Sequence, residues 1–479
     1  MKKTRQNFIA GEWLDGASAI DNINPSDTSD VIGEYAQADV AQTEQAIEAA
    51  SMALQAWANS PIQQRSDMLD RIGSEILARK EELGELVSRE EGKTRPEGIG
   101  EAMRAGQIFK YFGAEALRLG GEMFDSVRPG IDVSMTRSPV GVVGLILPWN
   151  FPIAIPAWKV APALAYGNCV VFKPAALVPA TAHVMSEIIV NAGVPEGVFN
   201  LVMGSGSKVG ATIVNHPKVN AISFTGSVPT GRGVAAAAVA RMAKVQLEMG
   251  GKNPLVILDD ADLSTAVECA VNGAYFSTGQ RCTASSRLIV TEGIHDQFVT
   301  AMKERLAGMT TDHALKAGTD IGPVVDQQQL QQDVDYIQIG RDEGANLVCG
   351  GEQVSRDTDG FFLTPALFTE TNNDMRINRE EIFGPVASVI RVKDYDEALA
   401  TANDTEFGLS SGIITTSLKY STDFKRNIQS GVANVNLPTA GVDYHVPFGG
   451  TKGSSYGARE QGSYAKEFYT TVKTAYTLS

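Results

Sequence analysis

The sequence predicts an α/β protein in which two lobes each contain a parallel sheet covered by helices. The first observation is a regular alternation of short apolar runs with helical segments before residue 250. The expected strands are 140–147, 169–173, 199–203 and 221–224, and the expected helices are 158–166, 179–192, 207–215 and 229–241. Short apolar strands separated by helices are typical of a parallel sheet that is buried on both faces.

The second observation is that the same alternation begins again after Gly250 and Gly251, which predicts a second Rossmann-like lobe. Its expected strands are 255–258, 287–290, 387–392, 412–414 and 432–435, and its expected helices are 262–276, 293–307 and 328–344. The third observation is the 47 glycines among 479 residues, many of them in loops, where a backbone without a side chain can approach a ligand closely.

A chain of 479 residues exceeds what one hydrophobic core usually supports, so more than one domain is expected. Amphipathic helices are predicted at 40–57, 62–90 and 98–119, and a strand at 132–137. We expect a first domain made of residues 1–119 and 138–250 and a second made of residues 251–435.

The composition excludes several classes of partner and site. The formal net charge of −15 makes nucleic acid and anionic membranes poor partners. No apolar stretch follows Lys2, Lys3 and Arg5, which argues against a secretory signal, and no apolar run approaches the roughly 20 residues of a membrane span. The four cysteines are not a disulfide framework, and metal-ligand spacings such as Cys-x-x-Cys or paired histidines are absent. We expect a cytoplasmic protein without a metal site.

Cys282 is the strongest candidate for a nucleophile. It lies in a glycine-containing turn, 277–283, after the expected helix 262–276, and Arg281 precedes it directly. A nearby cation or helix N-terminus lowers the pKa of a thiol from about 8.5 and so favours the reactive thiolate. The other cysteines are better explained by packing, in an apolar strand, on an apolar helix stripe and before two glycines: Cys169, Cys269 and Cys349.

Two further side chains could assist this nucleophile. Glu248 ends an apolar run beside two glycines, where partial desolvation would raise its pKa and make it a general base. Asn150 lies between Pro148 and Pro152 in a stiff loop, from which its amide could donate hydrogen bonds to an oxyanion. Each residue also has a plainer explanation, an exposed strand end for Glu248 and a rigid turn for Asn150.

Loops at the expected strand ends indicate a nucleotide site. Gly204 to Gly210 follows a strand and resembles a dinucleotide-binding fingerprint, with one residue too many between its second and third glycines. Lys173 ends the neighbouring strand, and the segment 224–227 ends the next one. Because carboxyl ends of parallel strands share one edge of a sheet, these loops are expected to lie together.

Taken together, these segments resemble the aldehyde dehydrogenase superfamily over essentially the whole chain. The matching segments are, in order, Asn24-Pro25, 148–152, Lys173-Pro174, 224–227, 247–252, 279–282, 380–385 and 447–450. Within the superfamily, the run 280–287 is similar to members that oxidise α-ketoglutaric semialdehyde. The resemblance implies a cofactor-binding lobe, a catalytic lobe, and a β arm of residues 120–137 and 460–479 that joins subunits as dimers or tetramers.

The resemblance also implies roles for individual residues. Cys282 would attack the aldehyde carbon, Asn150 and the backbone N–H of Cys282 would hold the oxyanion, and Glu248 would activate the water that releases the acid. NAD or NADP would accept the hydride. The residues expected to contact the cofactor are Ile146, Leu147, Pro148, Trp149, Lys173, Ala175, Ala176, Gly206, Gly210, Phe224, Thr225, Gly226, Ser227, Thr230, Met249, Gly250, Glu381 and Phe383. The residues expected to bind the substrate are Phe151, Trp158, Arg281 and Phe448.

Two segments depart from the common pattern of the superfamily. After Lys173-Pro174-Ala175, many NAD-preferring members have a glutamate that binds the ribose 2′-hydroxyl, whereas this chain has Ala176. Without that carboxylate a 2′-phosphate meets no repulsion and can pair with Lys173, so we expect NADP to be accepted and preferred over NAD. The run 452–460 is a variant of the usual Ser-Gly-x-Gly-Arg-Glu, which affects the local loop shape and not the chemistry.

The position of Arg281 leaves three interpretations open. Its guanidinium could bind a carboxylate at the far end of the substrate, which favours a semialdehyde. It could instead lower the pKa of Cys282, or form only a salt bridge. The alternative substrate is a sugar-derived aldehyde, held by hydrogen bonds from the loop 437–446.

Three other functions would use these residues differently. A cysteine hydrolase would pair Cys282 with a histidine such as His445 and would need no nicotinamide. A non-catalytic binding protein would not need Cys282, Glu248 and Asn150 together. An acylating dehydrogenase would pass the acyl group to coenzyme A, whereas Glu248 as a base for water favours hydrolysis.

Overall fold

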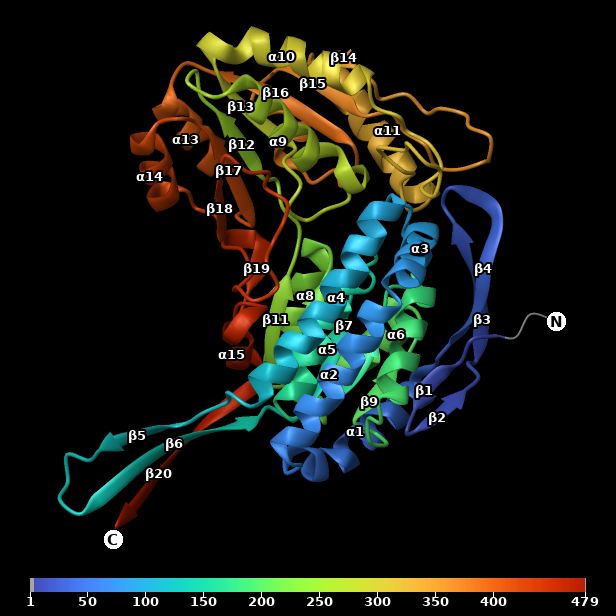
Figure 1. Ribbon diagram of the computed structural model, residues 1–479, viewed down its shortest axis with the longest axis vertical. Coiled ribbons are helices and arrows are strands. Elements are labelled where there is room, and N and C mark those ends of the chain that lie inside the picture. Colours follow the sequence, from blue (N-terminus) through green and yellow to red (C-terminus); the bar gives the residue numbers. More distant parts are fainter. Residues whose placement is uncertain (1–3, 479) are drawn as a thin grey trace.

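The computed structural model describes residues 4–478, so Lys2, Lys3 and the predicted limits at residues 1 and 479 lie outside the described residues. It contains two large sheets with helices packed against them and a small sheet that projects from the body of the molecule (Figure 1). The first lobe is the part built on the eight-stranded sheet, and the second lobe is the part built on the seven-stranded sheet. This architecture confirms the predicted fold class.

The strands of the first lobe follow the order β19-β11-β10-β7-β8-β9-β1-β2. Its five central strands are parallel: β7 (Val142–Ile146), β8 (Cys169–Lys173), β9 (Phe199–Leu201), β10 (Ala221–Thr225) and β11 (Lys244–Glu248). Their carboxyl ends therefore share one edge of the sheet, as expected for a ligand-binding edge. The pattern did not predict the short strands β1 (Asn7–Ile9), β2 (Glu12–Leu14) and β19 (Ser455–Tyr456), because so few residues cannot show a period.

The helices of the first lobe are α1 (Val40–Ala58), α2 (Ile62–Ala78), α3 (Lys80–Glu91), α4 (Arg95–Ala116), α5 (Ala154–Ala165), α6 (Pro179–Asn191), α7 (Ala211–Asn215) and α8 (Val228–Ala240). The predicted helix 62–90 is two helices, because Arg79 leaves the helical conformation, with φ −106° and ψ 17°. Helix α4 begins at a capping box of Thr94 and Glu97 and packs against α2 and α5. It therefore runs beside the loop that carries Asn150.

The second lobe has the strand order β14-β15-β16-β13-β12-β17-β18. The strands are β12 (Pro254–Ile257), β13 (Arg287–Thr291), β14 (Asn346–Cys349), β15 (Ala366–Thr371), β16 (Val386–Val392), β17 (Ser410–Ile414) and β18 (Val432–Val435). The helices are α9 (Leu263–Tyr275), α10 (Glu292–Ala307), α11 (Gln327–Asp342), α12 (Arg376–Arg379), α13 (Tyr395–Asn403) and α14 (Leu418–Asn427). Within residues 4–478, no helix combines the length and the apolar character that a membrane crossing needs.

The small sheet consists of β5 (Glu122–Asp125), β6 (Ile131–Pro139) and β20 (Thr470–Leu478), in the order β20-β6-β5 (Figure 1). β20 begins ten residues later than the predicted start of the arm at residue 460. The intervening residues form the short helices η4 (Gly462–Ala465) and α15 (Lys466–Tyr469), because Phe468 and Tyr469 are buried in the core of the first lobe. A separate hairpin, β3 (Ser18–Asn24) and β4 (Asp27–Gln37), lies at the edge of the molecule (Figure 1).

Candidate active site

Cys282 lies between α9 and β13, after the short helix η2 (Phe276–Gly279). The turn before it is strained, because Ser277 and Thr278 have positive φ angles of 51° and 57°. Asn253 holds the carbonyl oxygen of Cys282 by a hydrogen bond of 2.8 Å from its side-chain amide. The turn from the second lobe therefore presents the thiol to a cavity at the junction with the first lobe.

The thiol of Cys282 is protonated in the resting protein. Burial raises its pKa to about 12, and the nearby carboxyl groups of Glu248 and Glu381 act in the same direction. Hydrogen bonds from the backbone N–H groups of Cys282 and Thr283 oppose this shift without cancelling it. The net effect is opposite to the lowering that Arg281 was expected to produce, because desolvation outweighs that neighbouring charge.

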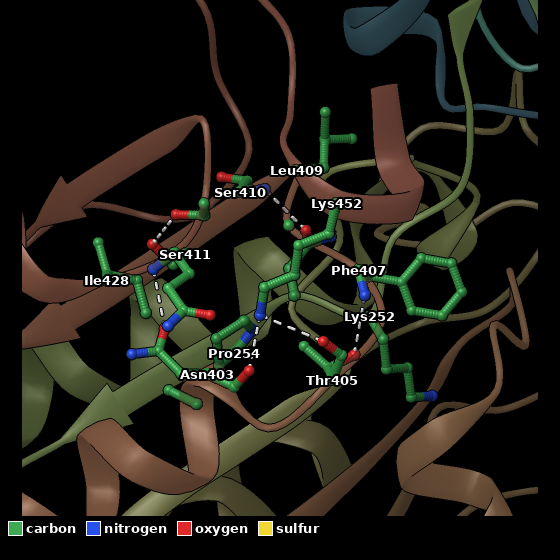
Figure 2. Close-up of a pocket in the computed structure, with 15 residues that line it drawn as sticks. Lys252, Pro254, Asn403, Thr405, Phe407, Leu409, Ser410, Ser411, Ile428 and Lys452 are labelled. Carbon is green, nitrogen blue, oxygen red and sulfur yellow. Dashed lines mark hydrogen bonds between the residues drawn. The ribbon is translucent and has the colours of Figure 1, made fainter. Parts of the chain in front are cut away.

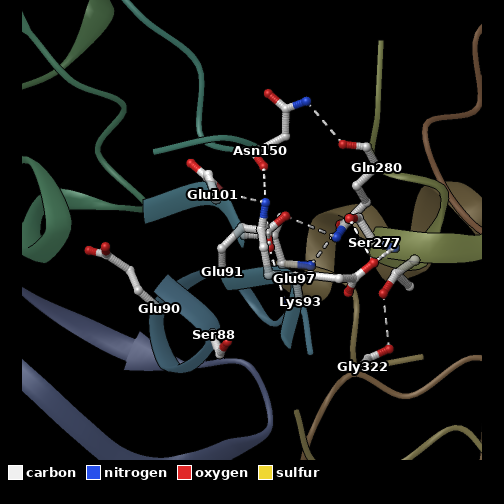
Figure 3. Close-up of polar contacts among 12 residues, drawn as sticks. Ser88, Glu90, Glu91, Lys93, Glu97, Glu101, Asn150, Ser277, Gln280 and Gly322 are labelled. Carbon is white, nitrogen blue, oxygen red and sulfur yellow. Dashed lines mark hydrogen bonds and ion pairs between the residues drawn. The ribbon is translucent and has the colours of Figure 1, made fainter. Parts of the chain in front are cut away.

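Asn150 connects the first lobe to the turn of Cys282. Its side-chain amide donates a hydrogen bond of 3.0 Å to the carbonyl oxygen of Gln280, two residues before the thiol (Figure 3). An amide nitrogen carries two N–H groups, so one remains for another acceptor. The predicted pairing of Asn150 with Cys282 is thus compatible with the position of the loop after β7.

Glu248 is the last residue of β11 and is 4 % exposed. Burial raises its pKa well above its ordinary value, and the neighbouring carboxyl group of Glu460 adds to the shift. The hydroxyl of Ser455, which donates a hydrogen bond of 2.6 Å to Glu248, and the cation of Lys159 act in the opposite direction. A desolvated carboxyl with a raised pKa is the kind of group that takes a proton from water near neutral pH.

The predicted cofactor residues lie along the carboxyl edge of the first sheet. Ile146 and Lys173 end β7 and β8, Thr225 ends β10, and Glu248 ends β11. The remaining members of the set follow these strands directly or begin the next helix: Leu147, Pro148, Trp149, Ala175, Ala176, Gly206, Gly210, Gly226, Ser227, Thr230, Met249 and Gly250. Phe224 is the residue of β10 before Thr225.

This edge fits a dinucleotide on three observations. The hydroxyl of Thr225 is buried without a hydrogen-bond partner among the described residues. A side chain at Gly206 would enter open space, so the loop leaves room above the backbone. Ser227 begins α8 without a side-chain cap, which leaves the first N–H groups of a helix available to an anion.

Glu381 and Phe383 bring the second lobe to the same edge. The ring of Phe383 meets that of Trp149 edge-on, with centroids 5.4 Å apart. The carboxylate of Glu381 accepts a hydrogen bond of 2.8 Å from the backbone N–H of Gly251, and burial raises its pKa to about 7. A nicotinamide nucleotide bound along the first sheet would reach Cys282 by passing between the Trp149–Phe383 ring contact and the Glu381–Gly251 hydrogen bond.

A cavity of about 360 Å³ contains Cys282. Three predicted substrate residues form its apolar wall, Phe151, Trp158 and Phe448, and the rings of Trp158 and Phe448 lie 5.6 Å apart. Arg281 also lines the cavity, but its guanidinium forms an ion pair of 3.1 Å with Glu97. Of the three interpretations of Arg281, the structure therefore shows the salt bridge.

Comparison with known proteins explains this combination of thiol, carboxylate and dinucleotide edge. Residues 13–475 match the sequence profile of the Aldehyde dehydrogenase family. The chain belongs to the aldehyde dehydrogenase family. It is 42% identical to an α-ketoglutaric semialdehyde dehydrogenase of Bacillus subtilis, over 99% of this chain and 98% of the relative.

Solved structures of other dehydrogenases share the fold. A crystal structure of betaine aldehyde dehydrogenase from Staphylococcus aureus in complex with NAD+ is 34% identical and has a TM-score of 0.97, over 99% of this chain and 95% of that one. A crystal structure of an NADP-dependent enzyme of E. coli is 33% identical, with a TM-score of 0.96, over 99% of this chain and 98% of that one. The protein is thus an NAD(P)-dependent aldehyde dehydrogenase.

No sequence pattern indicated the buried network that supports the dehydrogenase's Asn150 loop (Figure 3). Lys93 donates a hydrogen bond of 2.7 Å to the carbonyl oxygen of Asn150 and forms an ion pair of 2.7 Å with Glu101. Glu101 in turn accepts hydrogen bonds from the backbone N–H groups of Ile153 and Ala154, at the start of α5. Asn150 lies 57 residues from Lys93, and the two backbone partners of Glu101 lie 52 and 53 residues from it, so no local pattern links them.

The variant run 452–460 is the second feature that sequence reasoning left incomplete. Ser455 in this run reaches Glu248, and Glu460 accepts a hydrogen bond from the buried Lys159. Lys452 anchors the run to the second lobe through hydrogen bonds to the carbonyl oxygens of Asn403, at 2.7 Å, and Thr405, at 3.2 Å. Figure 2 shows this junction, where the remaining cavity of about 10 Å³ has room for little more than one water molecule.

The cysteine-hydrolase alternative lacks a suitable histidine. His445 is exposed, and it is not among the residues that line the cavity of Cys282. A hydrolase of this type needs a base within hydrogen-bond reach of the thiol. Glu248 is instead the carboxyl group whose charge is close enough to raise the pKa of Cys282.

Proposed function

We propose that this dehydrogenase oxidises a short semialdehyde that carries a carboxylate, such as α-ketoglutaric semialdehyde, to the corresponding dicarboxylic acid. The observation that carries the proposal is the cavity of Cys282, which combines an apolar wall with a surplus of cationic side chains. The 42% identical relative, whose name states this substrate, supports the same conclusion. A cavity of about 360 Å³ suits a small molecule of this size.

In the proposed reaction, the sulfur of Cys282 attacks the aldehyde carbon and the thiol proton passes to Glu248. The free N–H of the Asn150 amide and the backbone N–H of Cys282 donate hydrogen bonds to the oxygen of the thiohemiacetal. The chemistry that bound NAD(P)+ supplies is acceptance of the hydride from this carbon, which leaves a thioester. Glu248 then passes the thiol proton to solvent and, as a carboxylate again, removes a proton from the water that attacks the thioester. The carbon–sulfur bond breaks, the thiolate of Cys282 takes this second proton from Glu248, and the carboxylic acid is released.

The residues at the sheet edge would hold the dinucleotide in a fixed orientation. Lys173, at the end of β8, would contact the adenosine ribose, and the N-terminus of α8 after Ser227 would hold the pyrophosphate. The neighbouring rings of Trp149 and Phe383 would contact the nicotinamide end, and the carboxylate of Glu381 would accept a hydrogen bond from its ribose. These assignments rest on position along the edge, which the resemblance to the family first indicated.

We also propose that NADP is preferred over NAD. Burial lowers the pKa of Lys173 to about 8, so its amine is still cationic at neutral pH. Its nitrogen donates a hydrogen bond to the carbonyl oxygen of Pro174, and no acidic partner is found for it among residues 4–478. Ala176, three residues further on, is exposed and adds no carboxylate that would repel a 2′-phosphate. Similar solved structures include both an NAD+ complex and an NADP-dependent enzyme, so the proposal rests on Lys173 and Ala176.

A sugar-derived aldehyde fits the cavity less well. The residues of the loop 437–446 that line the cavity are Pro438, Ala440, Gly441 and Val442. None of these side chains carries a hydroxyl or an amide, so the loop offers a polyhydroxylated chain its backbone groups alone.

The decisive experiment is a panel of aldehydes, with NAD+ and NADP+, on the wild type and on Cys282→Ala. We expect kcat/KM to be highest for α-ketoglutaric semialdehyde with NADP+, and the variant to be inactive with every pair. A higher value for glyceraldehyde or for betaine aldehyde would contradict the substrate class. A strong preference for NAD+ would contradict the cofactor assignment, and full activity of the variant would contradict the mechanism.

We propose that the enzyme is a homodimer or homotetramer joined through the arm β5-β6-β20. The apolar side chains of Met123, Val472 and Tyr476 on this arm are 74%, 54% and 63% exposed. Exposed strands with apolar side chains are unfavourable in isolation and are usually paired with another chain.

A further inference from the structure

Arg104 is an unpaired cation beside the nucleophile. It lies on α4 and lines the cavity that contains Cys282. Its Nε and Nη2 atoms are buried, and no residue among 4–478 accepts a hydrogen bond or forms an ion pair with its guanidinium. A buried guanidinium loses hydration, and without a partner nothing replaces that loss.

The other charged side chains of the cavity are already paired. Lys93 lies 2.7 Å from Glu101, and Arg281 lies 3.1 Å from Glu97. These two pairs are neutral as units, so the cationic surplus of the cavity wall resides on Arg104. The position of Arg281 beside Cys282 in the sequence favoured it as the group that binds the substrate carboxylate, but its guanidinium is already paired with Glu97.

Neighbouring acids do not neutralise Arg104. Glu101 and Asp443 are the acidic groups near enough to influence it, and neither forms an ion pair with it. Glu101 is engaged by Lys93 and by two backbone N–H groups, and Asp443 is exposed to solvent. Burial lowers the pKa of the Arg104 guanidinium, which nevertheless stays protonated at neutral pH.

We propose that Arg104 binds the distal carboxylate of the substrate and is the residue that selects semialdehydes over neutral aldehydes; this inference rests on the proposed function. A guanidinium pairs with a carboxylate through parallel, charge-assisted hydrogen bonds. A neutral aldehyde of the same length offers no such partner, so it leaves the buried charge unpaired in the complex. The cavity thereby discriminates between substrates by the group at the end opposite the aldehyde.

The indole of Trp158 gives the same wall a second unpaired donor. Its Nε1 is buried without an acceptor, and Trp158 lines the cavity. A 2-oxo acid presents a keto oxygen next to its carboxylate, which can accept from an indole N–H when the carboxylate is held by Arg104. The two unpaired donors of Arg104 and Trp158 match an anionic, oxygen-rich end of the substrate.

The test compares 5-oxopentanoate with pentanal, two aldehydes of equal length that differ in the distal carboxylate. The measured quantity is the ratio of their kcat/KM values in the wild type, Arg104→Leu and Arg104→Lys. We expect the ratio to favour 5-oxopentanoate in the wild type and to fall about 100-fold in Arg104→Leu, mainly through KM. Arg104→Lys keeps the positive charge but lacks the paired N–H donors of the guanidinium. Its ratio should lie between those of the wild type and Arg104→Leu.

Two matched variants separate this role from others. Met103→Leu changes the exposed neighbour on α4 and should leave the ratio as in the wild type. Arg281→Leu tests the other cation of the cavity. The inference would be overturned if the preference for 5-oxopentanoate over pentanal were lost in Arg281→Leu and kept in Arg104→Leu. Inhibition by glutarate provides a readout without turnover, and we expect it to weaken in Arg104→Leu by the same factor.

Failure of the inference is distinguishable from failure of the proposed function. A wild type without preference for 5-oxopentanoate over pentanal would contradict the proposed substrate class. A wild-type preference that persists in Arg104→Leu would contradict the role of Arg104 alone. An equal fall of both kcat/KM values in Arg104→Leu would show a structural role and would also overturn the inference.

Discussion

At the scale of single residues, burial controls the chemistry of Cys282. The thiol has a pKa of about 12, raised by burial and by the carboxyl groups of Glu248 and Glu381. A thiol in this state is a poor nucleophile until a base removes its proton. Cys282 is therefore an unreactive thiol in the resting site. The nearby group that can take up its proton is Glu248, a buried carboxyl whose pKa is raised.

The pH dependence of Cys282 alkylation tests this state. A raised pKa means that the thiolate fraction grows with pH over the whole accessible range, so the rate should rise about tenfold per pH unit between pH 7 and 9. Peptide mapping after timed treatment with iodoacetamide measures the rate at Cys282 alone. Glu248→Gln removes one of the charges that raise the pKa and should accelerate alkylation. A rate that is fast and flat above pH 7 would contradict the raised pKa.

The proposed preference for NADP depends on Ala176 at the same scale. Ala176→Glu places a carboxylate near the expected 2′-phosphate, and repulsion should lower kcat/KM for NADP+ at least about tenfold while NAD+ is affected less. Ala176→Gln is the matched control, because it has a similar size without the charge. Equal losses with both cofactors in Ala176→Glu would mean that the side chain blocks the site sterically.

At the scale of elements, α4 organises the active site without supplying the nucleophile. Glu101 on this helix caps the start of α5 and holds Lys93, which binds the carbonyl oxygen of Asn150. The same helix carries Glu97, the partner of Arg281, and the unpaired Arg104. One face of one helix therefore positions the oxyanion donor and sets the charge of the substrate cavity.

Glu101→Gln tests the structural part of this role. The side chains of Lys93 and Glu101 are 1% and 2% exposed, so removal of one charge leaves the other buried with weaker compensation. We expect the free energy of unfolding to fall by about 3 kcal/mol, measured by urea denaturation. Lys110→Met on the same helix breaks an exposed ion pair with Asp70 and should cost less than about 1 kcal/mol. Similar losses in the two variants would contradict the structural importance of the buried pair.

At the scale of the whole molecule, the arm is the feature that a single chain leaves incomplete. Val472, Tyr476 and Leu478 alternate along β20 and are 54%, 63% and 76% exposed. Residues two apart in a strand share a face, so these side chains form one apolar stripe. A second chain that covers the stripe would bury it, which is the basis for the proposed oligomer.

The double variant Val472→Asp, Tyr476→Asp should separate the subunits. Two carboxylates in the stripe would have to be buried in the interface, so the sedimentation coefficient should shift to that of a smaller species. Lys473→Thr, on the other face of β20, serves as the control and should sediment as the wild type. An unchanged coefficient in the double variant would contradict an interface on this stripe.

The sequence by itself determined the fold class and the enzyme family, and it nominated the residues of the chemical centre. Strand and helix periods are local properties, so most of the alternation of apolar runs was readable without coordinates. The elements that were not predicted are the strands of two or three residues, the hairpin β3–β4, the strands β14 and β15, the helices α12 to α14 and the break at Arg79. The types of Cys282, Glu248 and Asn150, in segments that resemble one family, were sufficient to nominate them together. Adjacency in the chain also nominated Arg281 as the substrate cation.

Only the tertiary structure decided which charges are paired. Glu97 and Arg281 are 184 residues apart in the chain, and their ion pair of 3.1 Å depends on how α4 of the first lobe meets the turn of the second. The same packing buried Arg104 without a partner and raised the pKa of Cys282. Desolvation and ion pairing act through space over a few ångströms, so a one-dimensional pattern cannot specify them.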